Sequence, residues 1–479
     1  MTLDAVFRFR AGTHIGGGHA IRCLSLAEEL GSLGWNCALE CNDEAPDVVG
    51  ALRRGTVPLT NLDSATPTDL LVIDDYGVDQ VLEREQRGRT NRLLVIDDLG
   101  DRRHDCEALL DPTPGVTSDR HISNVPASCR MLLGARYALL RSAFRRRRPQ
   151  ALERRGPDRV GRVLVMPGQV DQADLATLAL HAVRSALPEA AIDIVLGAGA
   201  PHRTRLEREA DSGLTVHVDI DAQAMAVLMT TADLAIGAGG GGALERCALA
   251  LPTVLVVVAD NQKFVAAGLE AAGAARLAGC IECLDSNALA SLLASLAADP
   301  AGLKAMSEGA GALCDGYGTR RFAMAAVSTQ SLASGDTVAL RKVETDDAEQ
   351  MFLWQSAPQT RQFARNPEVP AWDDHVVWLD RRLADEDCLF AMVELDGQAV
   401  GLVRLDRRAA GSEVSIVVAP ERRGQGVGWA ALALVRRLAP RDRLTAFVKP
   451  ENTASLNLFE RAGYVPSGDG LLHQLPVAA

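Results

Sequence analysis

The segment VFRFRAGTHIGGGHAIRC, residues 6–23, runs from an apolar stretch through a glycine-rich loop into an amphipathic stretch. This pattern predicts a strand over Val6–Arg10 and a helix over His19–Leu33. Two later apolar runs, Leu70–Asp74 and Leu93–Asp97, predict buried strands that end in acidic residues. Buried strands joined by helices are typical of a parallel sheet with helices on both faces. We therefore expect the α/β fold class.

The same alternation returns in the second third of the chain. The strands predicted there are Val163–Met166, Ile192–Leu196, Leu214–Val218, Leu234–Gly237 and Thr253–Val258. Two such halves are expected to form a cleft where the carboxyl ends of both sheets face each other. Between them lies the arginine-rich segment 145–162, where Pro149 and Pro157 should break any long helix. Because no aromatic residues for base stacking are interleaved, this segment predicts a solvated linker.

A second break, rich in Ser, Gly and Ala, falls at Ser331–Asp336. The chain beyond it is richer in tryptophan, and Asp396-Gly397 predicts the turn of a strand pair. At about 150 residues per domain, 479 residues suggest roughly three domains. The predicted domains are residues 1–148, 160–330 and 337–479.

The composition excludes several classes of protein. Hydrophobic residues at 47% and charged residues at 23% indicate a globular chain with cores to bury. A formal net charge of -12 makes nucleic acid an unexpected main partner, because phosphate binding needs a basic face. The ten cysteines are scattered, the N-terminus lacks a signal-peptide pattern, and the longest apolar run, Leu251–Ala259, is too short for a membrane span. We expect a cytoplasmic protein with no membrane or nucleic-acid partner.

The first glycine loop ends in a histidine. Glycines at Gly17 and Gly18 let the backbone approach a ligand closely, and the amides that open a helix favour negative charge. His19 at the start of that helix would enter the cleft, where an imidazole suits a general base. The alternative is a tight turn whose histidine only caps the helix.

A second glycine loop, Gly237–Arg246, also follows a strand and opens a helix. Its amides at Gly239, Gly240 and Gly241 are predicted to cradle a diphosphate without a metal, and Glu245 to accept hydrogen bonds from ribose hydroxyls. The alternative is a flexible hinge.

Asn261 and Gln262 follow the buried strand Thr253–Val258. Their amides could hold a sugar or a phosphate, and the alternative is a polar turn.

The order of several motifs resembles the UDP-sugar hydrolases of the pseudaminic-acid pathway, which release a 2,4-diacetamido-2,4,6-trideoxyhexose from UDP. The matching segments are GGGHAIRC (16–23), DDY (74–76), IDDL (96–99), RHDC (103–106), LGARYALLR (133–141) and the pair Asn261-Gln262. The resemblance implies a two-domain GT-B fold. It also implies that His19 activates water with help from Tyr76, that Arg22 lies at the substrate site, and that Asn261 is a catalytic-site residue.

The chain departs from this family at several positions. Asp75 stands where the family usually has histidine, and MPGQVD (166–171) replaces a Phe-Gly-Gly-Ser-Asp type of loop. The second glycine loop lacks the family's Ser or Thr hydroxyls. No HExxH pattern or aspartate cluster indicates a metal, and Cys280–Cys283 is a single CxxC. We therefore expect hydrolysis without a metal.

The C-terminal domain carries a third glycine loop. Val414–Pro420 predicts a strand, after which RGQGVG (423–428) opens a helix and presents consecutive amides for a pyrophosphate. This loop and the later segment NTASLNLFERAGY (452–464) resemble the GNAT N-acetyltransferases. The resemblance implies acetyl-CoA as co-substrate. The residues it implies for acetyl-CoA are Val418, Arg423, Gly424, Gln425, Gly426, Gly428, Asn452 and Ser455.

In GNAT enzymes the strand before the loop is splayed, so a backbone amide near Val418 would polarise the thioester carbonyl. Glu413 lies at the start of that strand, where a carboxylate often deprotonates the amine; the alternative is a surface glutamate. Phe459 stands where many relatives have a tyrosine that protonates the leaving thiolate. Tyr464 is the remaining candidate for this acid.

The start of this domain, with segments 340–344 and 363–366 and Trp372, resembles the GNAT branch that acetylates UDP-linked amino sugars. The sequence therefore favours a bifunctional enzyme that N-acetylates a UDP-4-amino-4,6-dideoxy sugar and then releases UDP from the product with inversion. Two alternatives stay open: a GT-B glycosyltransferase fused to an acetyltransferase, and a sensor that binds nucleotide sugars without turnover.

Overall fold

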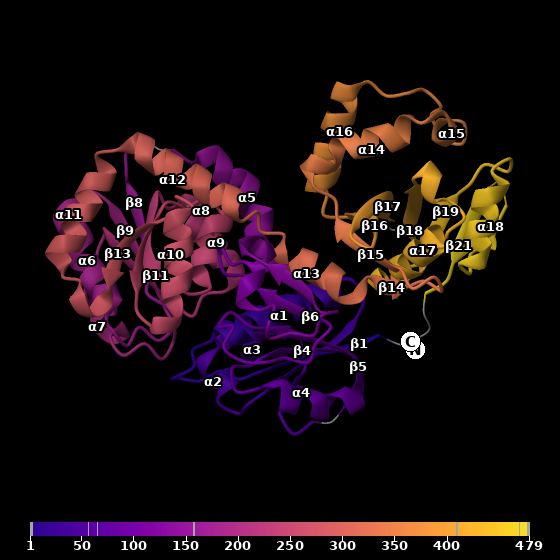
Figure 1. The fold of residues 1–479 in the computed structure, drawn as a ribbon. Helices are drawn as coiled ribbons and strands as arrows, with labels where there is room; N and C mark the ends of the chain where they lie inside the picture. The colour runs from indigo at the N-terminus through magenta and orange to yellow at the C-terminus, as the bar shows by residue number, and fades with distance from the viewer. Residues whose placement is uncertain are drawn as a thin grey trace. The chain divides into compact units, whose positions relative to one another are not determined.

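The computed structural model describes residues 3–55, 57–64, 66–156, 159–408, 411–468 and 470–476. The chain divides into two compact units (Figure 1). The larger comprises Ala5–Glu29 and Cys37–Phe322. The smaller comprises Ala323–Ala479 with the short segments Met1–Asp4 and Leu30–Asn36.

The first sheet of the larger unit has seven parallel strands in the order β3-β2-β1-β4-β5-β6-β7. Their bounds are β1 Asp4–Phe9, β2 Asn36–Cys41, β3 Leu59–Asn61, β4 Thr68–Asp74, β5 Thr90–Ile96, β6 Ala108–Asp111 and β7 Arg130–Leu133. The four segments predicted around the first glycine loop and the two acidic strand ends are confirmed as β1, α1 (Gly18–Ser32), β4 and β5.

The second sheet has six parallel strands in the order β10-β9-β8-β11-β12-β13. Their bounds are β8 Arg162–Met166, β9 Ala191–Leu196, β10 Leu214–Val218, β11 Leu234–Ala238, β12 Thr253–Val257 and β13 Arg276–Cys280. Both sheets have the doubly wound order, which reverses between β1 and β4 and between β8 and β11. The expected α/β class with two Rossmann-like halves is confirmed.

Helices cover both faces of the second sheet (Figure 1). One apolar cluster involves α6 (Leu175–Ala186) and α11 (Ser286–Ala297), and another involves helices on the opposite face. Those helices are α5 (Ser142–Arg154), α8 (Ala222–Thr231), α9 (Gly242–Ala248) and α10 (Lys263–Ala271). The remaining helices of the larger unit are α2 Ala45–Val48, α3 Gly50–Arg54, α4 Gln80–Gln86, α7 Arg203–Arg208 and α12 Pro300–Leu313; α13, Gly318–Val327, runs from this unit into the smaller one.

The predicted solvated linker is wrong for most of its length. Residues 142–154 form α5, and Pro149 lies inside this helix. Phe144 and Ala151 are buried, and the Arg148 guanidinium donates to the carbonyl oxygens of Ala248, Gly311 and Cys314. Arg148 therefore satisfies carbonyl groups of distant segments and helps to hold α5 in the packed fold. Pro157 lies outside the described residues.

The smaller unit is built on an eight-stranded, mostly antiparallel sheet in the order β14-β15-β16-β17-β18-β19-β21-β20. The bounds are β14 Thr329–Ser331, β15 Thr337–Lys342, β16 Cys388–Leu395, β17 Gln398–Arg408, β18 Gly411–Val418, β19 Leu444–Phe447, β20 Val465–Pro466 and β21 Leu471–Gln474. The predicted turn is confirmed, because Asp396 and Gly397 both have positive φ and join β16 to β17. Its helices are α14 Ala348–Ser356, α15 Pro358–Arg361, α16 Trp372–Ala384, α17 Val427–Leu438 and α18 Thr453–Arg461.

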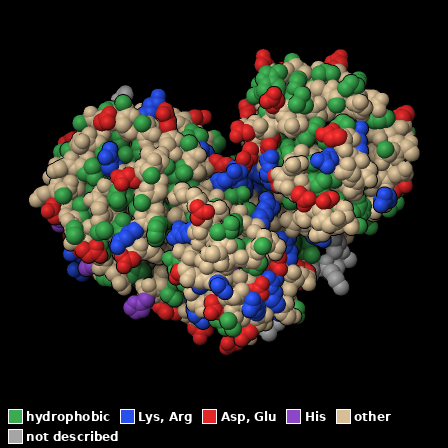
Figure 2. Space-filling view, viewed as in Figure 1, with side chains coloured by type: hydrophobic (Ala, Val, Ile, Leu, Met, Phe, Trp, Pro, Cys, Tyr) green, Lys and Arg blue, Asp and Glu red, His purple; other side chains and the backbone are tan. Residues whose placement is uncertain are grey.

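Exposed hydrophobic side chains gather over α14 and α16 (Figure 2). They include Leu353, Trp372 and Val377, with Val369 just before α16. Among the helices that the structure describes, none is both long and apolar enough to cross a membrane.

Candidate active sites

The reversal of strand order in the first sheet brings distant residues together. β1 pairs with β4, and β4 pairs with β5, so the carboxyl ends of these strands meet at one edge. The loop after β1 delivers His19, β4 ends at Asp74, and Asp98 follows β5. Ligand sites of doubly wound folds lie at this point of the sheet.

His19 forms a buried pair with Asp74. The Nδ1 atom of His19 lies 2.6 Å from Oδ1 of Asp74, and both side chains are almost fully buried. A carboxylate accepts and cannot donate, so Nδ1 carries the proton and Nε2 is the basic nitrogen. Burial would raise the pKa of Asp74, but the charges and hydrogen bonds of Arg22 and His19 outweigh it and lower that pKa. The pair therefore holds the histidine as an oriented base.

Arg22, one turn further along α1, binds two carboxylates. Its Nε and Nη2 atoms donate to Asp74 at 2.8 and 2.7 Å, and its Nη1 donates to Asp98 at 2.6 Å. Burial disfavours the charged guanidinium, yet these carboxylates raise the pKa of Arg22. The structure thus gives Arg22 a role in holding Asp74 and Asp98, while its expected contact with substrate stays a prediction.

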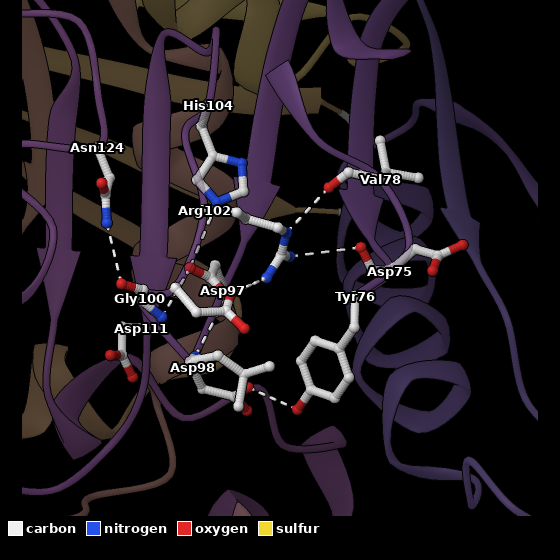
Figure 3. Close-up of polar contacts among 12 residues, drawn as sticks. Asp75, Tyr76, Val78, Asp97, Asp98, Gly100, Arg102, His104, Asp111 and Asn124 are labelled. Carbon is white, nitrogen blue, oxygen red and sulfur yellow. Dashed lines mark hydrogen bonds and ion pairs between the residues drawn. The ribbon is translucent and has the colours of Figure 1, made fainter. Parts of the chain in front are cut away.

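Tyr76 lies against the same network (Figure 3). Its hydroxyl donates to Oδ1 of Asp98 at 2.6 Å, as Figure 3 shows. Its ring meets the His19 ring edge-on at 4.5 Å between centroids. Burial and the neighbouring Asp98 carboxylate raise the pKa of Tyr76 well above its ordinary value. Tyr76 is therefore a neutral hydrogen-bond donor at physiological pH. The structure brings together the two residues expected to carry the hydrolysis, His19 and Tyr76.

The first glycine loop is tightly packed on one side. A Cβ atom at Gly17 would lie 2.6 Å from the Gln169 Oε1 atom and 2.7 Å from a Val49 methyl group. A Cβ at Gly18 would meet nothing within 4 Å. Gln169 belongs to the loop that departs from the family pattern, so this departure lies next to the first glycine loop. Asp75, the other departure, accepts a hydrogen bond from the Gly77 amide and faces Arg10 at 3.6 Å.

The second glycine loop follows β11, at the reversal point of the second sheet. The Gln262 Oε1 atom accepts hydrogen bonds from the amides of Gly239 and Val258, both at 3.2 Å. Gln262 therefore shapes this loop, and Asn261 beside it is exposed on the short turn Asp260–Gln262. A Cβ at Gly241 would meet nothing within 4 Å, so the described part of the chain leaves that side of the loop open.

Glu245 lies on α9, just after the second glycine loop. Burial raises the pKa of Glu245, and the nearby charges of Arg141 and Arg246 offset part of that effect. Arg246 is almost fully buried and donates to the Ala238 carbonyl at 2.8 Å. These contacts fix the end of β11, from which the loop starts.

In the part of the chain that the structure describes, no group of three or more His, Cys, Asp or Glu side chains is arranged to hold a metal ion. Hydrolysis without a metal stays a prediction. The oriented imidazole can take a proton from water, while the Tyr76 hydroxyl, whose single proton goes to Asp98, can accept a hydrogen bond.

The sheet of the smaller unit opens beside its glycine loop. β18 and β19 pair only at Ser412↔Leu444 and Glu413↔Thr445, although β18 continues to Val418. Beyond Glu413 the two strands separate, as expected. From Val414 onward, β18 is therefore not paired with β19.

The third glycine loop fits a cofactor that needs close backbone approach. Gly424 and Gly426 have φ values of +79° and +85°, a region that favours glycine, and a Cβ at Gly424 would meet nothing within 4 Å. The side chains of Arg423 and Gln425 bond back to the carbonyl oxygens of Val418 and Glu421, at 3.2 and 3.1 Å. The loop therefore presents its backbone amides at the start of α17, where a pyrophosphate would bind. Gly428 instead packs against Leu458, with a contact of 3.1 Å for an added Cβ.

Three other predicted acetyltransferase residues have structural partners. Glu413 forms ion pairs with Arg365 at 2.5 Å and with Arg408 at 3.6 Å, so both of its carboxylate oxygens already face cations. The Asn452 side chain caps α18 by accepting from the Ser455 amide at 3.1 Å.

Tyr464 is only 3% exposed, and burial raises the pKa of its hydroxyl well above the ordinary value. Its hydroxyl oxygen has no hydrogen-bond partner within the described ranges. This burial argues against Tyr464 as the acid that meets the leaving thiolate.

Sequence reasoning did not single out Asp74 or Asp98 as site residues. The available signal was that two apolar strands in succession end in acids, at Asp74 and at Asp97, which Asp98 follows. Acids at adjacent strand ends of a parallel sheet gather at one edge.

Comparisons with known proteins agree with part of this description. Residues 337–465 match a family model described as an acetyltransferase (GNAT) domain. The chain is also 30% identical over 146 residues to "UDP-2,4-diacetamido-2,4,6-trideoxy-beta-L-altropyranose hydrolase" of Campylobacter jejuni subsp. jejuni serotype O:2, a match that covers 30% of this chain and 53% of that protein. The match thus spans about half the length of that curated relative.

Two solved structures illustrate the range of similar folds. MurG of Acinetobacter baumannii has a TM-score of 0.46 at 16% identity, covering 67% of this chain and 98% of that one. The microcin C7 self-immunity acetyltransferase MccE, solved with acetyl-CoA and AMP, has a TM-score of 0.27 at 15% identity, covering 29% and 92%.

The fold and the family match define the C-terminal part as a GNAT acetyltransferase domain, which uses acetyl-CoA. The remainder is a pair of Rossmann-like halves, and the chain resembles a UDP-sugar hydrolase at a distance.

Proposed function

We propose that this chain is a bifunctional enzyme of nonulosonic acid biosynthesis. Residues 337–479 would N-acetylate the amino group of a UDP-4-amino-4,6-dideoxy sugar. The two Rossmann-like halves would then hydrolyse the resulting UDP-2,4-diacetamido-2,4,6-trideoxyhexose. The observation that best supports the hydrolase function is the buried His19–Asp74 pair. It leaves Nε2 of His19 as the base, at the edge of the sheet where doubly wound folds bind ligands.

In the hydrolytic step, Nε2 of His19 takes a proton from water while the water oxygen bonds to the anomeric carbon. The bond between that carbon and the diphosphate oxygen breaks, and UDP leaves with its electron pair. Attack from the face opposite the leaving group inverts the anomeric centre. Asp74 stabilises the imidazolium that forms, and the amides of Gly240 and Gly241 hold the departing diphosphate.

In the acetyl transfer, the substrate amine bonds to the acetyl carbon and the carbon–sulfur bond breaks. Coenzyme A leaves as a thiolate with the electron pair of that bond, and the proton lost from the amine ends on the thiolate. The open stretch of β18 supports a role for the Val418 amide in polarising the thioester carbonyl. Since Glu413 is paired with two arginines, we expect a water molecule to relay the amine proton.

The test supplies the full chain with a UDP-4-amino-4,6-dideoxy sugar and acetyl-CoA and follows products by mass spectrometry. We expect acetylated UDP-sugar first, and then free diacetamido sugar and UDP. His19→Ala should accumulate the acetylated UDP-sugar, because a general base contributes about 100- to 10,000-fold. His181→Ala, an exposed histidine on α6, is the matched control and should behave as the parent.

Three outcomes would overturn parts of this proposal. UDP release that requires an added acceptor would identify a glycosyltransferase. Tight binding of the nucleotide sugar with no release would identify a sensor. Release of UDP by the His19→Ala enzyme at the parental rate would remove the base from the mechanism.

A further inference from the structure

A second buried charge network lies behind Tyr76 and contains residues that the proposed mechanism does not use. His104 lies between two acids: its Nδ1 is 2.6 Å from Glu83 Oε1, and its Nε2 is 3.3 Å from Asp97 Oδ2. All three side chains are fully buried. Asp97 also accepts hydrogen bonds from the amides of Leu99 and Gly100, at 3.2 and 3.0 Å. Asp97 is therefore fixed from several sides.

Arg102 connects this network to the loop that carries Tyr76 (Figure 3). Its Nη1 donates to Asp97 Oδ1 at 2.9 Å, and its Nε donates to the Val78 carbonyl at 2.9 Å. Its Nη2 reaches the Asp75 carbonyl at 3.4 Å, and its guanidinium carbon lies 5.8 Å from the centre of the Tyr76 ring. The two carbonyl groups belong to residues on either side of Tyr76. One planar cation thus holds both ends of the turn.

The same contacts set the distance between two strand ends. Asp97 and Asp98 follow β5, whereas residues 75–78 follow β4. Because Arg102 bonds to both segments, it fixes the loop of Tyr76 against the residue that precedes Asp98. The Tyr76 hydroxyl then meets Asp98 at 2.6 Å, and its ring meets His19. Arg102 also donates to a second carboxylate, Asp101 at 3.0 Å, which plays no part in this connection.

We propose that Arg102, held by the buried Asp97–His104 pair, is a positioning residue that sets Tyr76 against Asp98 and His19. Its effect on catalysis rests on the proposed hydrolase function, whereas its effect on the Tyr76–Asp98 hydrogen bond does not. Lysine cannot replace it fully, because a single ammonium does not offer the planar, forked donors that reach two carbonyls and a carboxylate together.

The first measurement is independent of activity. The protein has four tyrosines, so tyrosine labelled with ¹³C at Cζ gives few signals, and Tyr76→Phe identifies that of Tyr76. At neutral pH, Arg102→Met should move the Tyr76 signal toward that of a tyrosine without a carboxylate partner. Arg102→Lys should move it part of the way. Arg84→Met is the matched control, since Arg84 is exposed and pairs with Asp105; it should leave the signal in place.

The second measurement is the split between kcat and KM for UDP release. A misplacement of about 1 Å can cost about 100-fold, so we expect kcat of the folded Arg102→Met enzyme to fall by about 10- to 100-fold while KM stays within about twofold. A Tyr76 signal unchanged in both Arg102 variants would overturn the inference. Should the parent release no UDP, the proposed function fails, and the signal of Tyr76 still decides the positioning role.

Discussion

The Nδ1 atom of His19 lies 2.6 Å from Oδ1 of Asp74, although the two residues are 55 positions apart in the chain. Asp74 is fully buried, and Arg22 neutralises part of its charge through two further hydrogen bonds. The imidazole is therefore held in one tautomer, with its basic nitrogen fixed in direction. In the proposed mechanism, the efficiency of His19 as a base therefore depends on Asp74.

Replacing Asp74 by Asn tests that dependence. The amide keeps the size of the side chain but can donate to Nδ1, which favours the wrong histidine tautomer. We expect kcat for UDP release to fall by about 100- to 10,000-fold. Acetyl transfer to the amino sugar, measured on the same preparation, should stay at the parental rate. A parental rate of UDP release in Asp74→Asn would show that the pair is not needed for hydrolysis.

Gly18→Ala tests whether a ligand approaches the first glycine loop. Nothing within 4 Å would meet the added methyl group, so the folded protein should keep its Tm. A substrate that approaches the backbone there would meet the methyl group, and we expect KM for the UDP-sugar to rise by about tenfold, equivalent to about 1.4 kcal/mol. Gly88→Ala, which also has open space, is the control. An unchanged KM in Gly18→Ala would place the substrate elsewhere.

The buried His104 predicts a loss of stability at alkaline pH. Burial disfavours the imidazolium, but the hydrogen bonds and charges of Asp97 and Glu83 outweigh it and raise the pKa of His104 to about 9. Because this pKa lies above the ordinary value of about 6.5, the contribution of charged His104 to the free energy of unfolding is fully present below a pH of about 6.5. It is lost as the pH rises through about 9, and it amounts to on the order of 3 kcal/mol.

Urea unfolding followed by circular dichroism from pH of about 6 to pH of about 10 measures this contribution. His104→Gln should be less stable than the parent at neutral pH, because it removes the cation that lies between the buried carboxylates of Glu83 and Asp97. The difference between the two proteins should shrink toward high pH. His181→Gln, with an exposed histidine, should show no such pattern. A difference that is constant across this range would contradict a charged His104.

Gly426→Val tests the acetyl-CoA loop. Gly426 has a φ of +85°, so a β-branched residue is strained there, and its side chain would displace the amides that receive the pyrophosphate. We expect acetyl-CoA affinity, measured by calorimetry, to weaken by at least about tenfold. UDP release from pre-acetylated substrate should not change. Full retention of acetyl-CoA binding would remove the main support for the cofactor site.

The sequence by itself determined the classes of structure and the places where ligands could bind. Period and hydrophobic pattern are local properties, so the strands before both glycine loops, the helix starts and the Asp396-Gly397 turn were all predictable from neighbouring residues. The same holds for His19 and for the loop at residues 423–428, because a glycine run between a strand and a helix is visible in the chain. The type of residue at such a loop indicates which chemistry the loop could support, as a histidine indicates a general base.

Only the tertiary structure decided which side chains meet. Asp74 becomes the partner of His19 because β1 and β4 are neighbours in the sheet, and Arg102 holds Tyr76 because β4 and β5 are. The helix around Pro149 packs against distant segments, whose carbonyl groups accept the guanidinium donors of Arg148. The burial of Tyr464 and the ion pair of Glu413 with Arg365 also depend on segments that are distant in the chain. Hydrogen bonds and burial depend on distances in space, which strand order sets and local sequence does not.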